Sequence, residues 1–322
     1  MKRARRWALL ILCAALLSGC AAQQPAGDVR GGEGQTLISA DTEGLAPAAL
    51  SAALYFRYAA TPYLAPQVRQ IDVQRDETPE RAIVQALLDG PSGAAGFLNA
   101  LFPPGTEVLA TLSQGDTLFI TFNEALMGRY ADESAVDLAP SAREEAALRR
   151  RLCLDALSAT LTEAGLCARV QVLVYRGASQ GNSMRLPAGF LDQSGDESLL
   201  APLTRREDSL LTPHNTAALL MNAWMNQDWA GLYDFTARGG GSARPREQSA
   251  YDAYAEGRTL IRYSLSPGSV SLDGKAAVVS VDMTLLGEAE DGEIAGYPLR
   301  LQREDGLWKI GFEDLIRMMN QD

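Results

Sequence analysis

Histidine is nearly absent from this 322-residue chain, which contains only His214. A Ser-His-Asp triad would need that residue beside a reactive serine, and the sequence has no Gly-x-Ser-x-Gly elbow. One histidine and two distant thiols disfavour a zinc site. Gly239-Gly240-Gly241 lacks the lysine of a phosphate-binding loop, and the paired acids are typical of solvated faces. We therefore expect no enzymatic activity, no catalytic residues, no cofactor and no metal.

Basic residues are also scarce, since 29 Lys and Arg stand against 40 Asp and Glu for a formal charge of −11. The first 19 residues hold four of these bases and no acid, so the chain from residue 20 onward is near −15 (−11 minus 4). Such a body is repelled by nucleic acid and by anionic lipid. We expect no nucleic-acid partner, and any membrane attachment must come from another source.

No apolar run after residue 20 reaches the length of about 20 residues that a spanning helix needs. Before it, a basic head precedes eleven apolar residues, Trp7 to Leu17, which is typical of a signal peptide. Leu17-Ser18-Gly19-Cys20 resembles a bacterial lipobox. The resemblance implies cleavage after residue 19 and lipidation of Cys20, which anchors the protein to the extracytoplasmic face of the cell membrane. The alternative is an ordinary signal peptide with a chance cysteine.

The chain has four cysteines, and two of them are taken up by this N-terminal processing. Cys13 leaves with the signal peptide and Cys20 carries the lipid. Cys153 and Cys167 remain, and export permits a disulfide between them. Cys153 lies on the apolar stripe of a predicted helix, nearly three turns before its end. The sequence therefore leaves two possibilities open, which are a disulfide between these residues or two buried, reduced thiols.

Composition divides the remaining chain into a tether, two domains and a connection. Residues 20–48 have few large apolar groups and are expected to be a flexible tether. Residues 49–178 alternate strand and helix patterns, including a helix over about 142–164 and a continuous β-branched strand at 170–174. Residues 179–204 are rich in Gly, Ser and Asp and are interpreted as an interdomain connection, in which Leu186 to Leu191 can pack locally. Residues 205–322 begin with helices and continue as a β-meander with Asp-Gly turns, which predicts an α+β fold of two domains.

The first domain, residues 49–178, resembles the GerMN domain of GerM-type sporulation and germination lipoproteins. The resemblance is carried by a series of short motifs in the family's order. These are Leu54-Tyr55-Phe56, Leu87-Leu88-Asp89-Gly90-Pro91, Leu101-Phe102-Pro103-Pro104-Gly105-Thr106, Leu118-Phe119-Ile120-Thr121-Phe122, Thr160-Leu161-Thr162-Glu163 and Val170-Gln171-Val172-Leu173-Val174. It implies a compact α/β interaction domain that acts in envelope assemblies. The chain has one such domain where GerM-type proteins often have two.

The second domain, residues 205–322, resembles NTF2-like domains, in which helices pack against a curved sheet. The resemblance rests on Trp224-Met225-Asn226-Gln227-Asp228-Trp229 and on Gly306-Leu307-Trp308-Lys309-Ile310. That architecture hosts both enzymes and binding modules. Its aromatic residues either fill the core or line a pocket in the open end of the cone.

Together these patterns predict a non-enzymatic envelope lipoprotein that binds envelope proteins through its first domain, in sporulation or germination. The alternative is a ligand-binding or sensory lipoprotein that works through an NTF2-like pocket and binds a small molecule. A hydrolase in the second domain is a third hypothesis, which the lack of paired His and acidic motifs disfavours. A filled cone would favour the first hypothesis, and a cavity lined by aromatic residues would favour the others.

Overall fold

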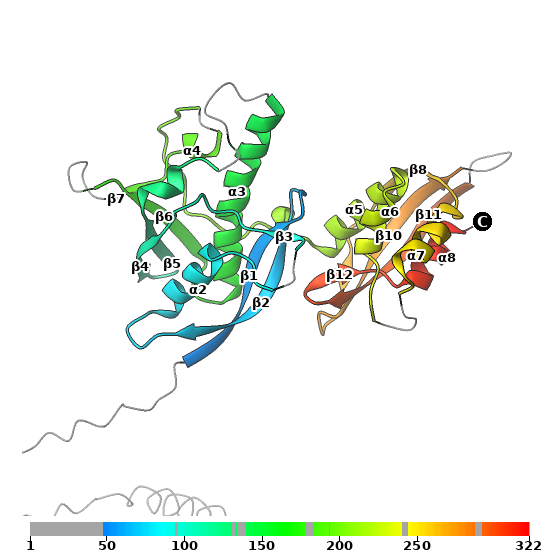
Figure 1. Cartoon of the computed structure of the whole chain (residues 1–322), viewed down its shortest axis with the longest axis horizontal. Coiled ribbons are helices and arrows are strands. Elements are labelled where there is room, and N and C mark those ends of the chain that lie inside the picture. The colour runs from blue at the N-terminus through cyan, green and yellow to red at the C-terminus, as the bar shows by residue number, and fades with distance from the viewer. Residues whose placement is uncertain are drawn as a thin grey trace, which may run out of the picture. The chain divides into compact units, whose positions relative to one another are not determined.

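The structure is a computed structural model that describes residues 48–93, 96–130, 133, 140–177, 183–192, 194–239, 244–286 and 292–321. It mixes helices and sheets in both halves, which confirms the predicted α+β class (Figure 1). The predicted signal peptide and Cys20 lie outside the described residues, as does the tether up to residue 47. In the described part of the chain, no helix is both long and apolar enough to span a bilayer.

The N-terminal half contains two sheets and two longer helices. Its elements are β1 (Ala48–Tyr58), β2 (Leu64–Val73), α2 (Pro79–Leu88), β3 (Leu98–Asn99), β4 (Val108–Gln114), β5 (Thr117–Phe122), η1 (Glu124–Met127), α3 (Pro140–Glu163), β6 (Arg169–Tyr175), β7 (Ser183–Arg185) and α4 (Gly189–Asp192). One sheet has the order β2-β1-β3 and the other β4-β5-β6-β7. β5 and β6 are parallel and are joined through α3, which makes a βαβ crossover.

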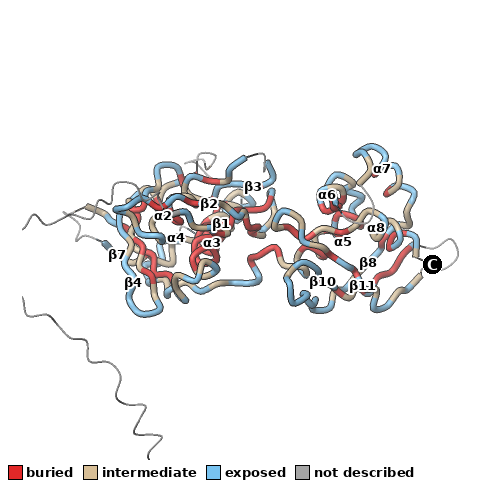
Figure 2. The backbone as a smooth tube through the Cα atoms, turned by 90° about the horizontal axis from the view of Figure 1, so that it is seen from below, coloured by how far each residue is buried: buried red, intermediate tan, exposed pale blue. Residues whose placement is uncertain are grey.

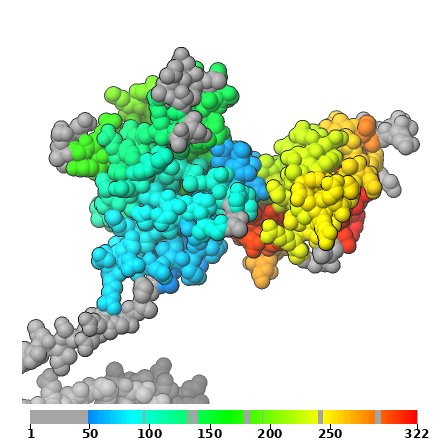
Figure 3. All heavy atoms as spheres, viewed as in Figure 1, coloured from blue at the N-terminus to red at the C-terminus, as the bar shows by residue number. Residues whose placement is uncertain are grey.

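α3 forms the centre of this half. The sequence predicts one apolar stripe on it, whereas every residue from Leu152 to Leu161 is buried (Figure 2). The reason is that α3 contacts β1 as well as β6 and α4, so several of its faces are covered. A polar side chain of the helix also forms a hydrogen bond to β1, because the Tyr55 backbone N–H donates to Thr160 Oγ1 at 3.1 Å. The space-filling view shows residues of α3 and of α2 on the surface of this half (Figure 3).

Several local features of this half follow from its sequence. The side chain of Thr78 accepts from the Arg81 N–H at the start of α2, with Pro79 in the first turn. β4 and β5 form a hairpin around Gly115. Gly165 follows α3 with a φ of +71°, a left-handed conformation that glycine adopts without strain. β6 lies between β5 and β7, as its uninterrupted β-branched pattern predicts.

The segment interpreted as an interdomain connection packs onto the N-terminal half wherever it is described. β7 pairs with β6, and the Leu186 N–H donates to the Val172 carbonyl oxygen at 3.4 Å. Further along, Leu203 and Val170 exchange backbone hydrogen bonds of 2.9 and 2.7 Å. Arg205 then stacks on the Tyr55 ring and pairs with Glu163 at 2.7 Å. The structure thus extends the packed N-terminal half past residue 178, while independent folding of the two halves stays a prediction.

The C-terminal half has helices that pack on an antiparallel sheet. Its elements are η3 (Glu207–Ser209), α5 (Pro213–Met225), α6 (Trp229–Asp234), α7 (Glu247–Ala255), β8 (Leu260–Leu265), β9 (Ser269–Val270), β10 (Ala276–Leu285), β11 (Gly292–Glu304), β12 (Leu307–Lys309) and α8 (Phe312–Met319). The sheet order is β12-β11-β10-β8, with β9 also on β10. Bulges interrupt the register of β10 with both of its long neighbours, and the sheet curves around the helices (Figure 1). This confirms the predicted helix-plus-curved-sheet arrangement.

Candidate functional site

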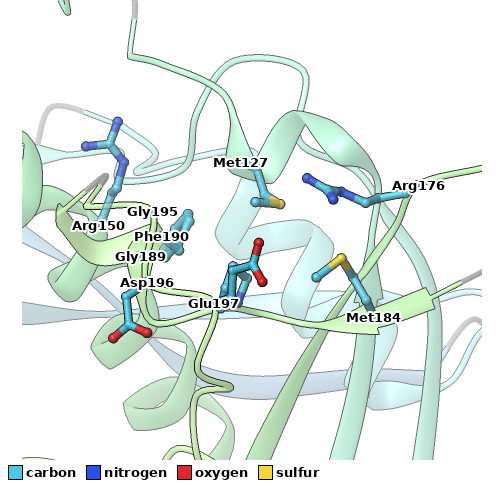
Figure 4. Close-up of a pocket in the computed structure, with 10 residues that line it drawn as sticks. Met127, Arg150, Arg176, Met184, Gly189, Phe190, Gly195, Asp196 and Glu197 are labelled. Carbon is cyan, nitrogen blue, oxygen red and sulfur yellow. The ribbon is translucent and has the colours of Figure 1, made fainter. Parts of the chain in front are cut away.

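The main candidate site is a groove of about 590 Å³ in the N-terminal half, at the end where β6, β7 and α4 meet. Its apolar wall consists of Met127, Met184 and Phe190. Charged side chains complete the lining, namely Arg150, Arg176, Asp196 and Glu197 (Figure 4). The volume lies within the range of roughly 300–1,000 Å³ that is typical of ligand sites.

Elements from four places in the sequence bring the groove together. Met127 is the last residue of η1, and Arg176 directly follows β6. Met184 lies opposite Val174 in the β6–β7 pairing, so the strand register fixes its position. Phe190 belongs to α4, which packs against α3. Because these residues are scattered along the sequence, no local motif announces the groove.

The loop from residue 187 to 199 is closed by its own backbone. Gly189 N–H donates to the Asp196 carbonyl oxygen at 2.8 Å, and Ala188 N–H donates to that of Ser198 at 2.6 Å. A Cβ at position 189 would lie 2.7 Å from the Asp196 nitrogen, so only glycine fits there. The Asp196 carboxylate accepts from the Ser198 N–H at 2.9 Å, which holds it in the loop. The neighbouring Glu197 is thereby positioned with its carboxylate toward the groove (Figure 4).

The two arginines of the groove differ in their partners. Arg150 is almost fully buried and donates to both carboxylate oxygens of Glu133, at 2.7 and 2.6 Å. Its guanidinium also lies over the Tyr130 ring, where burial raises the pKa of the phenol. Arg176 has no hydrogen bond or ion pair with any described residue, and its Nε is buried without a partner. Arg176 is therefore the cation that remains available to a ligand.

Two other clefts contain arginines whose donors are already used. Arg57, in a cleft of about 350 Å³, pairs with Glu145 and donates to the backbone oxygens of Ala60 and Thr61. Arg262 lies in a cleft of about 540 Å³ on the C-terminal sheet and pairs with Glu293 at 2.5 Å. Internal pairing of this kind reduces what each cation can offer to a ligand. Arg176 and its groove are therefore the better candidate.

Part of the N-terminal half matches a known protein family. The Germane family, described as "Sporulation and spore germination", matches residues 53–175. Residues 53–175 are thus similar to the Germane family. The groove lies at one end of this domain, with Met127 and Arg150 inside the matched range and Arg176 directly after it. No curated protein matches the chain.

Three solved structures resemble the chain. The tandem GerMN domains of the sporulation protein GerM from Bacillus subtilis share 19% identity, cover 52% of this chain and 50% of that one, and give a TM-score of 0.32. A putative lipoprotein from Clostridium perfringens shares 20% identity over 48% of this chain and 87% of that one, with a TM-score of 0.27. A function unknown protein from Mycobacterium tuberculosis shares 22% identity over 30% of this chain and 64% of that one, with a TM-score of 0.24. The chain thus spans half the length of the GerM structure that it matches.

The structure has Cys153 and Cys167 as free thiols. Cys153 is fully buried in α3 of the Germane domain, and burial raises the pKa of its thiol. Cys167 is half-buried just before β6, and partial burial raises its pKa as well. Neither thiol lines the groove. His214 is exposed in the first turn of α5. Among the described residues, no cluster of three or more metal-ligating side chains occurs.

The aromatic residues of the C-terminal half mainly fill its core. Trp224 is 1% exposed, and its indole N–H donates to the Arg258 carbonyl oxygen at 3.0 Å. Tyr254 is fully buried and shares a 2.8 Å hydrogen bond with Thr236, while Trp308 is 6% exposed. Trp229 and Tyr233 are half-buried beside them. This packing favours the hypothesis of a filled cone over that of an aromatic-lined cavity.

Proposed function

We propose that this protein is a non-enzymatic, lipid-anchored component of an envelope assembly that acts in sporulation or germination. Its Germane domain binds a partner protein, and the C-terminal half extends or modulates that contact. The lipobox-like end at Cys20 supports attachment at the extracytoplasmic membrane surface, because acylation supplies the adhesion that the acidic body lacks. The family description supports the biological process.

The observation that carries the proposal is the groove of the Germane domain. It combines an adaptable apolar wall, with Met127 and Met184, and an unpaired guanidinium in Arg176. Grooves of this composition suit the side chains of another protein. The C-terminal half contributes paired charges and a packed aromatic core, so we assign it the secondary role.

Two deletions within the anchored chain test this function. The first removes residues 213–322 and keeps the whole packed N-terminal half. The second removes residues 48–211 and keeps the tether and the C-terminal half. Co-purification from detergent-solubilised membranes, quantified for each recovered envelope protein, should show partners retained by the first chain and lost by the second. The assignment fails if the C-terminal half alone retains every partner or turns over a small substrate.

A further inference from the structure

Arg176 is in an unusual position for a partly buried arginine. Its Nε is inaccessible to solvent and lacks a hydrogen-bond acceptor among the described residues. A buried donor without a partner costs free energy, and a ligand that supplies the acceptor recovers it. The guanidinium extends toward Met127 rather than out of the groove (Figure 4). The planar fork of arginine matches a carboxylate, with which it forms two parallel hydrogen bonds.

The wall beside Arg176 suits an apolar side chain. Met127 and Met184 place flexible thioethers on either side of the space that Arg176 enters (Figure 4). Phe190 contributes a rigid ring that is itself 5% exposed and therefore well supported. Methionine adapts its shape to different apolar partners, whereas the phenyl ring fixes the floor. A leucine-sized side chain next to a carboxylate fits this combination.

The opposite wall carries negative charge. Glu197 directs its carboxylate into the groove, and it forms no ion pair with Arg176. Its backbone position is set by the closed loop, in which Gly189 and Asp196 are hydrogen-bonded to each other. Arg150 does not neutralise Glu197, because its guanidinium is taken by Glu133. The groove therefore presents a cation and an anion on opposite walls, with an apolar wall between them.

We propose that this groove binds an extended segment of a partner protein in which an acidic and a basic side chain flank an apolar one. The acidic side chain pairs with Arg176 and the basic side chain with Glu197. The apolar side chain packs on Met127, Met184 and Phe190. The inference rests on the proposed function, since it specifies the chemistry of the protein partner that the Germane domain binds.

Methyl NMR of the methionines tests this inference. The chain contains 8 methionines, so the ¹³C-methyl resonances of Met127 and Met184 can be assigned by Met→Leu substitution. The chain from residue 20 onward, with Cys20→Ser, is titrated with acetyl-Glu-Leu-Lys-amide and with acetyl-Lys-Leu-Glu-amide. Acetyl-Gln-Leu-Gln-amide is the uncharged probe of similar size. We expect a saturable shift of both methyl groups with at least one charged peptide, and binding of the uncharged peptide that is about tenfold weaker or more.

Three variants make the result specific. Arg176→Met keeps an apolar stem and should weaken the binding of the charged peptide by about tenfold or more. Glu197→Gln should also weaken the binding of the charged peptide. Arg300→Met removes an exposed arginine in the C-terminal half and should leave the binding unchanged. Equal shifts with all three peptides, binding that survives Arg176→Met, or no shift with either charged peptide would overturn the inference. The deletion experiment above is independent of these outcomes, so a Germane domain that retains its partners would show that only the assigned chemistry is wrong.

Discussion

Phe190→Ala gives the sharpest structural prediction, because it tests whether the segment that contains Phe190 stabilises the N-terminal half or is a solvated connection. In a solvated interdomain connection, this substitution would change the free energy of unfolding by no more than about 0.5 kcal/mol. In the structure, Phe190 is 5% exposed and α4 packs against α3. Truncation of a buried phenylalanine to alanine costs about 3–5 kcal/mol. With an m-value of about 2 kcal/mol/M, a loss of about 4 kcal/mol lowers the urea midpoint by about 2 M.

The chain provides its own probes for this measurement. The tryptophans of the described chain, Trp224, Trp229 and Trp308, all lie in the C-terminal half, so their fluorescence reports unfolding of that half. Far-UV circular dichroism reports both halves. Phe190→Ala should lower the midpoint of the dichroism transition of the N-terminal half and leave the fluorescence transition in place. The matched control is Leu199→Ala, since Leu199 is 52% exposed in the same segment.

Two results would refute this reasoning. If Phe190→Ala costs no more than Leu199→Ala, the segment does not stabilise the N-terminal half. If the fluorescence transition moves together with the dichroism transition, the two halves unfold as one cooperative unit. The first result would restore the interpretation of residues 179–204 as a simple connection, and the second would contradict the prediction of two independent cores.

Three further predictions concern anchoring, pH and thiols. Cys20→Ser should release the protein from membranes or leave it uncleaved, and processed protein that still needs detergent for extraction would contradict the lipid anchor. Burial lowers the pKa of Lys309 from 10.5 to about 8. Between these two pH values the unfolded chain binds more protons than the folded chain. The contribution of Lys309 to the free energy of unfolding therefore rises with pH across that window. Lys309→Met should remove this rise from urea midpoints followed by tryptophan fluorescence, and an unchanged dependence of the midpoint on pH would count against the pKa shift. The thiols are counted with Ellman's reagent on Cys20→Ser protein that lacks the signal peptide and is kept free of reductant. Two thiols should react after denaturation, whereas Cys153 should be unreactive in the native state. The absence of reactive thiols after denaturation would indicate a disulfide.

Local signals in the sequence predicted much of the fold. Thr78 and Asp228 cap their helices, and such caps can be read from the sequence because the side-chain acceptor and the N–H group that it binds are only three residues apart. Asp305 and Gly306 both have positive φ, which is the conformation that an Asp-Gly hairpin turn requires. These features depend on neighbours in the chain and not on the tertiary fold. The type of an element likewise depends on its own residues, whereas its ends depend also on the elements that pack against it, so the types were easier to predict than the ends.

Features that depend on distant partners were missed. α7 and α8 begin after Arg246 and Gly311, neither of which provides a side-chain cap, so neither helix has a start signal in the sequence. β2 extends back to Leu64 because it pairs with β1 along its whole length, and that pairing has no local signal in the sequence. The complete burial of α3 likewise reflects elements that pack on several of its faces.

The groove could not be predicted, because Met127, Arg176 and Phe190 are brought together only by the fold. The one local signal was the pair of glycines in the loop from residue 187 to 199. Gly189 is needed for a close backbone approach and Gly195 adopts a φ of +75°. Such glycines indicate a tightly closed loop, but they do not reveal what lies beneath it.

Site-specific photo-crosslinking in intact cells tests most directly whether the Germane domain binds a partner through this groove. A photoreactive amino acid replaces Met184, inside the groove, or Val278, which is 40% exposed on β10 of the C-terminal half. The account predicts a discrete crosslinked species from position 184 in membrane fractions, its yield lowered about tenfold or more by Arg176→Met, and no such species from position 278. The same species from both positions, or none from position 184, would contradict it.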